Sequence, residues 1–187
     1  MKKRILFFVK TVLVLVLAFT AGISAVNGSE KNVCAGSGLE IGQEYQGGII
    51  AYLDATGKHG LIAAPEDIGT AQWYSGQVSL VTTGAEIGAG KSNTTRIVQL
   101  QDSSSYAARL CDDLVLNGYD DWFLPSKDEL NLLYQHRLEI GGFDYTGIYW
   151  SSTEESYNTV WYQYFGNGYQ YYYYKYYACK VRAVRAF

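Results

Sequence analysis

The stretch NGYDDWFLPSKDELNLLY, residues 117–134, carries the strongest local structure signals in the chain. Ser126 is followed three residues later by Glu129, the spacing of a capping box, in which each side chain accepts a hydrogen bond from the other residue's backbone N–H at the start of a helix. Apolar residues then recur at helical spacing: Leu130, Leu133 and Tyr134. This pattern predicts a helix that begins just after Ser126 and buries one stripe.

Upstream of this stretch, residues 103–118 predict another helix. Tyr106, Leu110 and Leu114 share a stripe, and Asn117-Gly118 is a typical stop signal. Beyond residue 142 the pattern changes to short runs rich in aromatic and β-branched residues, which is typical of strands separated by turns. The expected strands are IYWSS (148–152), VWYQYF (160–165), YQYYYY (169–174) after a GNG turn, and KVRAVRAF (180–187).

The first half of the chain predicts a hairpin followed by an irregular segment. GGIIAYL (47–53) and LIAA (61–64) read as two strands around the turn DATGKHG, and residues 65–90 are glycine-rich without a clear period. Helices in the middle and an antiparallel sheet at the end of the chain give an α+β fold with two helices and a small antiparallel sheet.

The N-terminus has the order of parts of a secretory signal. MKKR is positively charged, and an apolar run ending in small residues follows it. Lys10 interrupts the apolar stretch, so what remains is short for an uncleaved membrane anchor, which is the alternative. We expect a signal peptide over 1–25, a linker over 26–40 and a single domain over 41–187, in a protein that is secreted, at the cell surface or in the periplasm. Membrane contact is expected only through the signal segment, if it stays uncleaved.

Charge narrows the class of partner. The 187 residues include 15 basic and 18 acidic side chains, and removal of residues 1–25 leaves 11 basic and 18 acidic, a net charge of −7. An acidic exported body is a poor binder of a phosphate backbone, so no nucleic-acid partner is expected. From residue 157 onward there are four basic and no acidic residues, which favours an acidic partner for the tail.

Three cysteines, Cys34, Cys111 and Cys179, occur in a chain bound for an oxidising compartment. One disulfide and one leftover thiol is the arithmetic expectation, the sequence leaves all three pairings open, and small buried thiols are the alternative. Their spacing matches no metal site, and no metal or other cofactor is expected.

The motif AEIGAGKS, residues 85–92, satisfies the loose pattern of a nucleotide-binding loop, with Lys91 and Ser92 in the phosphate and magnesium positions. No later strand ends in a magnesium-binding aspartate, and no alternation of strands and helices builds a parallel sheet. We therefore interpret the segment as a glycine loop that leads to Ser92 as the N-cap of a helix over NTTRIVQLQ (93–101).

Other candidate catalytic or metal groups have simpler explanations. His59 lies in a turn and His136 near a helix end, so both are expected in solvent. The pairs Asp112-Asp113, Asp120-Asp121 and Glu154-Glu155 offer oxygen ligands to calcium, but solvated carboxylates are the expected reading. No catalytic constellation is present, so we do not expect an enzyme.

Four pieces of the chain resemble a known bacterial family: GGIIAY (47–52), DWFLPSKDEL (121–130), YWSSTE (149–154) and VRAVRAF (181–187). The family is the C-terminal domain of the Legionella collagen-like adhesin, also described as a domain of unknown function. It implies a C-type-lectin-like fold of the formylglycine-generating-enzyme type over roughly residues 41–187. Relatives carry a cysteine where this chain has Ala183, so a disulfide from Cys111 to the last strand is not carried over.

Some relatives are similar in a further way, as variable proteins of diversity-generating retroelements, in which asparagine codons near the C-terminus are changed to many others. The segment of about 155–179 looks like such a cassette, interleaved with fixed-looking residues: Trp161, Gln163, Phe165, Gln170 and Lys175. The resemblance implies that the remaining positions face a ligand. They are Tyr157, Asn158, Thr159, Tyr162, Tyr164, Asn167, Tyr169, Tyr171, Tyr172, Tyr173, Tyr174, Tyr176 and Tyr177.

Strand alternation and the cost of burying tyrosine hydroxyls also predict that the tyrosines face outward. In VWYQYF as a strand, Trp161, Gln163 and Phe165 share one face and Tyr162 and Tyr164 the other, so the tyrosines are expected outside. YQYYYYKYY, residues 169–177, has seven tyrosines in nine residues and fills both faces. Burying them all would require a partner for each hydroxyl, whereas exposed tyrosines give large contact area at low entropic cost. We assign Trp122, Leu124, Leu130, Leu133 and Trp150 to the core, and give Arg182 and Arg185 structural roles.

The function expected from these observations is that of an exported binding protein that presents a tyrosine-rich face to a protein or glycan on another cell or surface. Two alternatives remain. One is a glycan-binding module without diversification. The other is an enzyme of the formylglycine-generating type, which would need a reactive pair of cysteines near the C-terminus.

Overall fold

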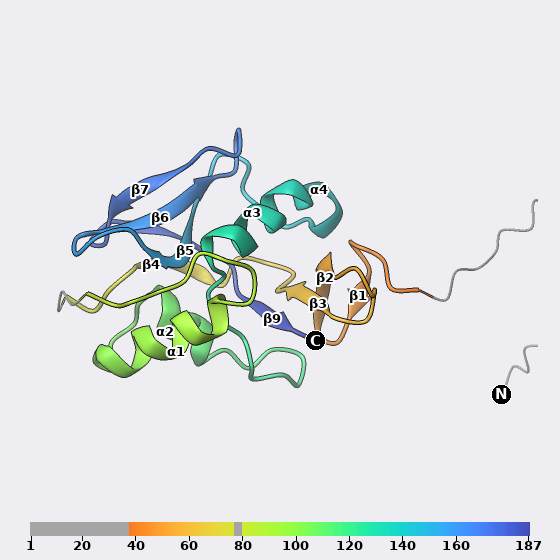
Figure 1. Ribbon diagram of the computed structural model, residues 1–187, viewed down its shortest axis with the longest axis horizontal. Helices are drawn as coiled ribbons and strands as arrows, with labels where there is room; N and C mark the ends of the chain where they lie inside the picture. Colours follow the sequence, from red (N-terminus) through yellow and green to blue (C-terminus); the bar gives the residue numbers. More distant parts are fainter. Residues whose placement is uncertain (1–37, 77–79) are drawn as a thin grey trace, which may run out of the picture. The chain divides into compact units, whose positions relative to one another are not determined.

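Helices occupy the middle of the chain and strands lie on either side of them, as the sequence predicts. The structure is a computed structural model that describes residues 38–76 and 80–187 (Figure 1). The elements are β1 (Glu44–Tyr45), β2 (Gly48–Leu53), β3 (Gly60–Ala63), β4 (Gly69–Gln72), α1 (Gly90–Leu100), α2 (Ala107–Asp112), α3 (Lys127–Gln135), α4 (Arg137–Ile140), β5 (Ile148–Glu154), β6 (Thr159–Tyr164), β7 (Gln170–Tyr174), β8 (Ala178–Val181) and β9 (Val184–Ala186).

The strands form two sheets. One has four strands in the order β1-β2-β3-β9, and the other has five in the order β4-β8-β5-β6-β7. All neighbours are antiparallel except β5 and β8, which run parallel and pair only between Tyr149 and Lys180. Strand β7 is therefore an edge strand, and the hairpin predicted over 47–64 is confirmed as β2 and β3.

The last stretch of sequence is divided between the two sheets rather than forming one strand. β8 belongs to the five-stranded sheet, β9 pairs with β3, and Arg182 lies between them, fully buried. Its guanidinium donates to the carbonyl oxygens of Ala64 and Pro65 and pairs with Asp67. Arg182 thus satisfies polar groups left open where the chain changes sheets, which confirms its structural role.

The capping box predicted at the start of α3 is present. Ser126 Oγ accepts from the backbone N–H of Glu129 at 3.3 Å, and Glu129 Oε2 accepts from the N–H of Ser126 at 2.7 Å. Leu130 and Leu133 are fully buried and Tyr134 is half-buried, so the helix buries the predicted stripe.

The core consists of two clusters. One joins α1 and α2 to the five-stranded sheet around Ile97, Cys111 and Trp150, and the other joins α3 and α4 to the four-stranded sheet around Leu133 and Phe165. Helices α1 and α2 lie together on one side of the structure (Figure 1). All five side chains assigned to the core from the sequence are buried: Trp122, Leu124, Leu130, Leu133 and Trp150.

The glycine loop that resembles a nucleotide-binding loop packs against the side-chain carboxyl group of Glu129. The N–H of Gly88 donates to Glu129 Oε1 at 2.8 Å, and an ideal Cβ on Gly90 would lie 2.2 Å from Glu129 Oε2. Helix α1 begins at Gly90 after Ala89 without a side-chain cap, so the prediction of Ser92 as N-cap is wrong. Ser92 instead donates its hydroxyl to the carbonyl of Ala89, and Lys91 is exposed.

The described residues contain four helices, two more than the fold-class prediction, and one of them, α1, is the helix expected over 93–101. The helix expected over 103–118 covers only Ala107–Asp112, because the chain turns back at Asn117, whose φ of 52° lies in the left-handed region, and Leu116 pairs with Tyr119. A further strand, β4, lies in the segment expected to be irregular, where β8 supplies the partner that gives GTAQ its extended form.

The predicted signal peptide, residues 1–25, lies outside the described residues, as does the linker up to residue 37. Within residues 38–76 and 80–187 there is no helix with the length and apolar character needed to cross a membrane. The described residues belong to a single compact unit.

Candidate ligand-binding face

The tyrosine-rich segment forms a hairpin made of β6 and β7. The two strands pair in register from Thr159↔Tyr174 to Gln163↔Gln170. Gly168 closes the turn with a φ of 80°, where an added Cβ would lie 2.3 Å from the ring of Tyr134. The turn is therefore fixed against α3, and β7 lies at the outer edge of its sheet (Figure 1).

The register determines which side chains share a face of the hairpin. Val160 lies opposite Tyr173 and Tyr162 opposite Tyr171, so these four lie on one face, and they continue the face of Trp150. The other face carries Trp161 opposite Tyr172, whose rings meet edge to face with centroids 6.1 Å apart. Lys127 from α3 covers Trp161, with Nζ 3.6 Å from the ring centroid.

The alternation predicted for VWYQYF is present, but the division into inside and outside is only partly correct. Gln163 and Phe165 are buried, whereas Trp161 is half-exposed beneath Lys127. Tyr162 is half-buried and packs against the core cluster that contains Trp150. The expectation of a fully displayed Tyr162 is wrong, because the face it occupies continues the covered face of β5.

Most of the predicted ligand-facing residues are exposed. We define the tyrosine surface as the seven tyrosines of the segment whose exposed fractions lie between 38% and 56%: Tyr157, Tyr169, Tyr171, Tyr172, Tyr174, Tyr176 and Tyr177. Asn158 and Asn167 are also exposed, and Tyr164 and Tyr173 are half-buried. Thr159 is a correction, because it is buried and donates its hydroxyl to the carboxylate of Glu155.

The exposed rings support one another by stacking. Tyr171 and Tyr172 have centroids 4.2 Å apart, and a hydrogen bond of 3.0 Å joins their hydroxyls. Tyr174 stacks on Tyr176 with centroids 5.3 Å apart, and Tyr177 on Tyr173 at 4.1 Å. Such pairs contribute about 0.5–1.5 kcal/mol beyond area burial, so the rings are held in defined positions.

The fixed-looking residues between the tyrosines attach the hairpin to the body. Gln163 Nε2 donates to Asn131 Oδ1 at 2.9 Å, and Gln170 Nε2 donates to the carbonyl of Lys127 at the same distance. Lys175 is buried, forms an ion pair with Glu154, and lies with its Nζ 5.0 Å from the centroid of the Trp73 ring. These side chains fix the hairpin to the body of the domain and so support the tyrosine rings.

The edge of β7 leaves backbone groups open. Lys175 N–H donates to Asn158 and Tyr164 N–H to Tyr169, which marks these as the hydrogen-bonded pairs of the hairpin. Because such pairs alternate along an antiparallel ladder, the backbone groups of Gln170 and Tyr172 and the N–H of Tyr174 point away from β6, whereas the carbonyl of Tyr174 accepts from the N–H of Tyr177. An extended partner segment therefore has donors and acceptors beside the tyrosine surface.

The excess positive charge of the tail is neutralised within the fold. Lys175 pairs with Glu154, Arg182 with Asp67, and Arg185 with Asp121. Lys180 lies 3.5 Å from Asp67 and 3.3 Å from Asp144. The net charge of the tail therefore does not by itself favour an acidic partner, because each of its four cations pairs with an acidic residue of the chain.

Several phenols of this region have a raised pKa. Burial raises the pKa of Tyr162 and of Tyr173, and the hydrogen bond with Tyr171 raises the pKa of Tyr172. Burial also raises the pKa of Glu154, against the stabilising effect of Lys175. The rings of the tyrosine surface carry hydroxyls that can both donate and accept hydrogen bonds.

A hollow of about 390 Å³ opens beside the tyrosine surface. Strands β5 and β8, which pair only between Tyr149 and Lys180, both contribute to its lining, and no local sequence pattern predicts it. Its lining includes Tyr173 and Tyr177 on the aromatic side and Asp144, Thr146 and Lys180 on the polar side.

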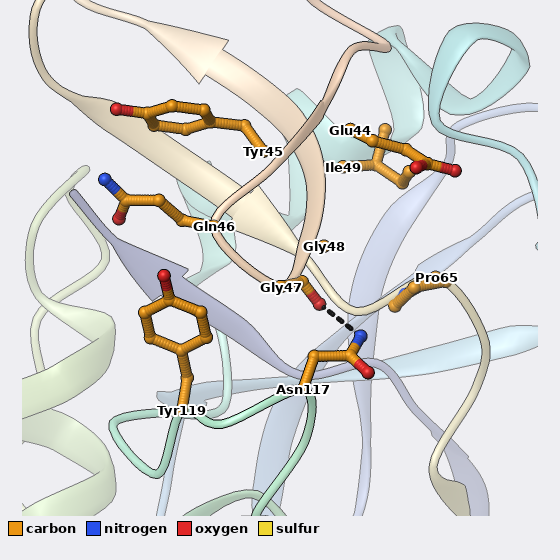
Figure 2. Close-up of a pocket in the computed structure, with 9 residues that line it drawn as sticks. All are labelled: Glu44, Tyr45, Gln46, Gly47, Gly48, Ile49, Pro65, Asn117 and Tyr119. Carbon is orange, nitrogen blue, oxygen red and sulfur yellow. Dashed lines mark hydrogen bonds between the residues drawn. The ribbon is translucent and has the colours of Figure 1, made fainter.

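A second hollow, of about 540 Å³, lies at the turn between β1 and β2 and does not involve the tyrosine surface (Figure 2). Asn117 Nδ2 donates to the carbonyl of Gly47 at 2.9 Å, as Figure 2 shows. The guanidinium of Arg185 donates to Gln46 Oε1 and covers the ring of Tyr119 at 4.0 Å. Polar groups here are engaged in holding the C-terminal strand to the first hairpin.

The acidic pairs and histidines provide no metal site among residues 38–76 and 80–187, where no three candidate ligands converge. The expectation of solvated carboxylates is wrong for Glu154 and Asp121, which pair with Lys175 and Arg185. The hydrogen bonds from Arg185 lower the pKa of Asp121. His59 is exposed, and His136 is half-buried at the end of α3.

Cys111 and Cys179 are both buried free thiols, so no disulfide joins them. Burial raises the pKa of Cys179 to about 12 and places that of Cys111 well above its usual range. Cys34 lies outside the described residues, and a pairing that involves it stays a prediction.

Comparison with solved structures gives a likeness in fold. The chain is similar to a fimbrial protein from Bacteroides ovatus ATCC 8483, with 15% sequence identity and a TM-score of 0.51. The match covers 73% of this chain and 43% of that protein, so this chain spans less than half of its length. No curated protein matches the sequence.

Comparison with family models confirms the resemblance read from the motifs. The match covers residues 70–185, which includes DWFLPSKDEL and YWSSTE and most of VRAVRAF, while GGIIAY lies before its start. It spans more than half of the sequence, including α1–α4, the tyrosine-rich hairpin and the strand that follows it. The chain belongs to the Lcl C-terminal domain family.

Proposed function

We propose that this protein is an exported adhesin-like module that binds a protein or glycan on another cell or surface through the tyrosine surface. The observation that carries the proposal is a cluster of exposed, mutually stacked tyrosines on a hairpin anchored by buried side chains. An exposed aromatic patch of this kind is typical of an interaction site, and tyrosine is enriched among the residues that dominate binding energy. The α+β scaffold would be C-type-lectin-like, as the family resemblance implies, and non-enzymatic.

We also propose that the segment of about 155–179 is diversified. The five fixed-looking residues are those that attach or fill the hairpin, and most of the others are exposed, so exchange at the exposed positions would leave the support intact. The gene neighbourhood tests this. A reverse transcriptase gene and a near-copy of the segment's coding sequence are expected, and the absence of both would remove diversification while leaving binding.

The buried cysteines argue against the formylglycine-generating type of enzyme. That chemistry requires a reactive thiolate, whereas burial raises the pKa of both Cys111 and Cys179. A thiol of this kind is inert at neutral pH.

Binding of the labelled chain to printed arrays of glycans, mucin and collagen, with and without chelator, tests the proposed function. We compare the parent with a variant in which Tyr169, Tyr171, Tyr172, Tyr174 and Tyr176 are serine. Loss of array binding in this variant, with thermal unfolding still cooperative, supports the proposal. The matched control replaces Leu100, Val115 and Leu138, which are exposed elsewhere, by serine and should bind like the parent. Equal binding by the five-serine variant and the parent overturns the proposal.

A further inference from the structure

The hollow between β5 and β8 combines an aromatic wall with a fixed polar wall. Tyr177 and Tyr173 stack with centroids 4.1 Å apart and an interplanar angle of 10°, which produces a flat platform, and Tyr177 is 39% exposed. The polar part of the lining includes the loop before β5, where Asp144 and Thr146 lie. A volume of about 390 Å³ falls within the usual range for small-molecule sites, about 300–1,000 Å³.

The polar wall is held in one arrangement before any ligand arrives. Asp144 Oδ1 accepts from both the N–H and the hydroxyl of Thr146, at 2.8 and 2.7 Å, and its other oxygen lies 3.3 Å from Lys180 Nζ. Gly147 leaves room for the lysine, because a Cβ there would lie 2.8 Å from Lys180 Cδ. Asp144 nevertheless remains 40% exposed, so it has capacity to accept from a ligand.

The balance of charge in the hollow selects against ionic ligands. One ammonium, that of Lys180, stands between the carboxylates of Asp67 and Asp144. Asp67 lies outside the lining and is also paired with Arg182, so the charges around the hollow balance. A phosphate, sulfate or carboxylate would meet the carboxylate of Asp144 at close range, and a cation would meet the ammonium of Lys180. A neutral molecule with several hydroxyls avoids both and gains charge-assisted hydrogen bonds to carboxylate and ammonium.

We infer that this hollow is a binding site for a neutral sugar ring, with one face of the pyranose against Tyr177 and its hydroxyls directed to Asp144, Lys180 and Thr146. A pyranose presents C–H groups on its faces and hydroxyls around its rim, which matches an aromatic platform next to a polar wall. This inference rests on the proposed function and narrows its ligand to a neutral glycan. No metal ion takes part.

Isothermal titration calorimetry of the full chain with the methyl glycosides of glucose, galactose and mannose tests the inference. We expect at least one to bind with a dissociation constant on the order of 1 mM, as for a small ligand with one stacking contact. Tyr177→Ala should weaken binding about tenfold by removing the platform, while Tyr177→Phe keeps it. Asp144→Asn should weaken it about tenfold by removing the charged acceptor.

The controls separate a local effect from unfolding. Leu138→Ala, at an exposed position away from the hollow, should bind like the parent, and each variant should keep the parent's dispersed NMR amide spectrum. Two further probes complete the set: a sulfated disaccharide and the methyl ester of Nα-acetyl-lysine. Binding of either without binding of a neutral glycoside overturns the inference.

The failure of this inference is distinguishable from the failure of the proposed function. If no glycoside binds, or if binding is indifferent to both Tyr177→Ala and Asp144→Asn, the sugar site is wrong. Array binding that still disappears in the five-serine variant would then leave the tyrosine surface as the binding face. That variant retains Tyr173 and Tyr177, so if the sugar site is right it should still bind the free glycosides in titration, while array binding, which also needs the five exposed rings, is lost.

Discussion

Glu129 shows how much one residue can organise at the smallest scale. Its carboxylate caps its own helix, accepts from Gly88 in the loop before α1, and lies fully buried. Burial raises its pKa, whereas the hydrogen bonds it accepts act in the opposite direction. The capping box could be predicted from the spacing of two residues, but the loop that closes over it could not.

Gly90→Ala should destabilise the fold by more than about 2 kcal/mol, because the added methyl would overlap the Glu129 carboxylate and the ring of Phe123. The loss is expected although alanine is the better helix former. Denaturant unfolding measures it, and Gly38→Ala, where a Cβ meets nothing within 4 Å, is the matched control. Equal stability of Gly90→Ala and the parent would contradict the packing described here.

Lys175→Met should cost about 3–5 kcal/mol at pH 7, because the carboxylate of Glu154 would remain buried without its ion partner. Burial already raises the pKa of Glu154, and loss of the lysine raises it further. A raised folded-state pKa makes stability greatest at low pH and lowers it as pH rises through that value.

The cost of Lys175→Met should therefore shrink as the pH falls toward about 4. Chemical unfolding at several pH values measures this. The double variant Lys175→Met/Glu154→Gln should recover part of the loss at pH 7. A cost that is independent of pH would show that Glu154 is not the origin of the effect.

At the scale of elements, the hairpin of β6 and β7 divides into a covered and an open part. Tyr162→Ala should destabilise the fold by about 2–4 kcal/mol, since its ring packs against the core cluster around Trp150. Tyr169→Ala removes a ring that is 56% exposed and should change stability by less than about 1 kcal/mol. Thermal unfolding of the two variants measures the contrast, and similar losses for both would contradict the assigned orientation.

The sequence predicts elements well where the signal is local and poorly where a distant partner decides. The start of α3 and the first hairpin follow from Ser126, Glu129 and short-range alternation. The sequence of β4, GTAQ, does not predict a strand, because it becomes one only through pairing with β8. The orientation of Tyr162 does not follow from the sequence. Alternation separates the two faces of β6, but it does not show which face continues the buried face of β5.

The candidate site was predictable to a similar extent. The composition of residues 169–177 points directly to exposed tyrosines, and most of them are exposed. The hollow beside them is lined by Tyr177 and also by Asp144 and Thr146, which come from a distant part of the sequence, so this arrangement depends on the tertiary fold. The net charge of residues 157–187 is also a poor guide to the partner, because a count of lysines and arginines does not show that each one is paired within the fold.

At the scale of the whole molecule, the core shields both described cysteines. Alkylation with iodoacetamide at pH 8 should leave Cys111 and Cys179 unmodified in the native protein, because burial blocks access and raises the pKa of each thiol. In denaturant both should react fully. Peptide mapping by mass spectrometry measures the extent of labelling at each position, and rapid labelling of Cys179 under native conditions would contradict its burial.

The internal pairing of every cation in the tail has a consequence for the conditions under which this face can work. Dissolved ions weaken attraction between exposed charges over about 8–10 Å at ordinary ionic strength, and an attachment based on such charges loosens as salinity rises. Phenol rings on an electrically balanced support give the ions little to screen. The affinity of binding through this surface should therefore be almost the same in fresh water and in brine.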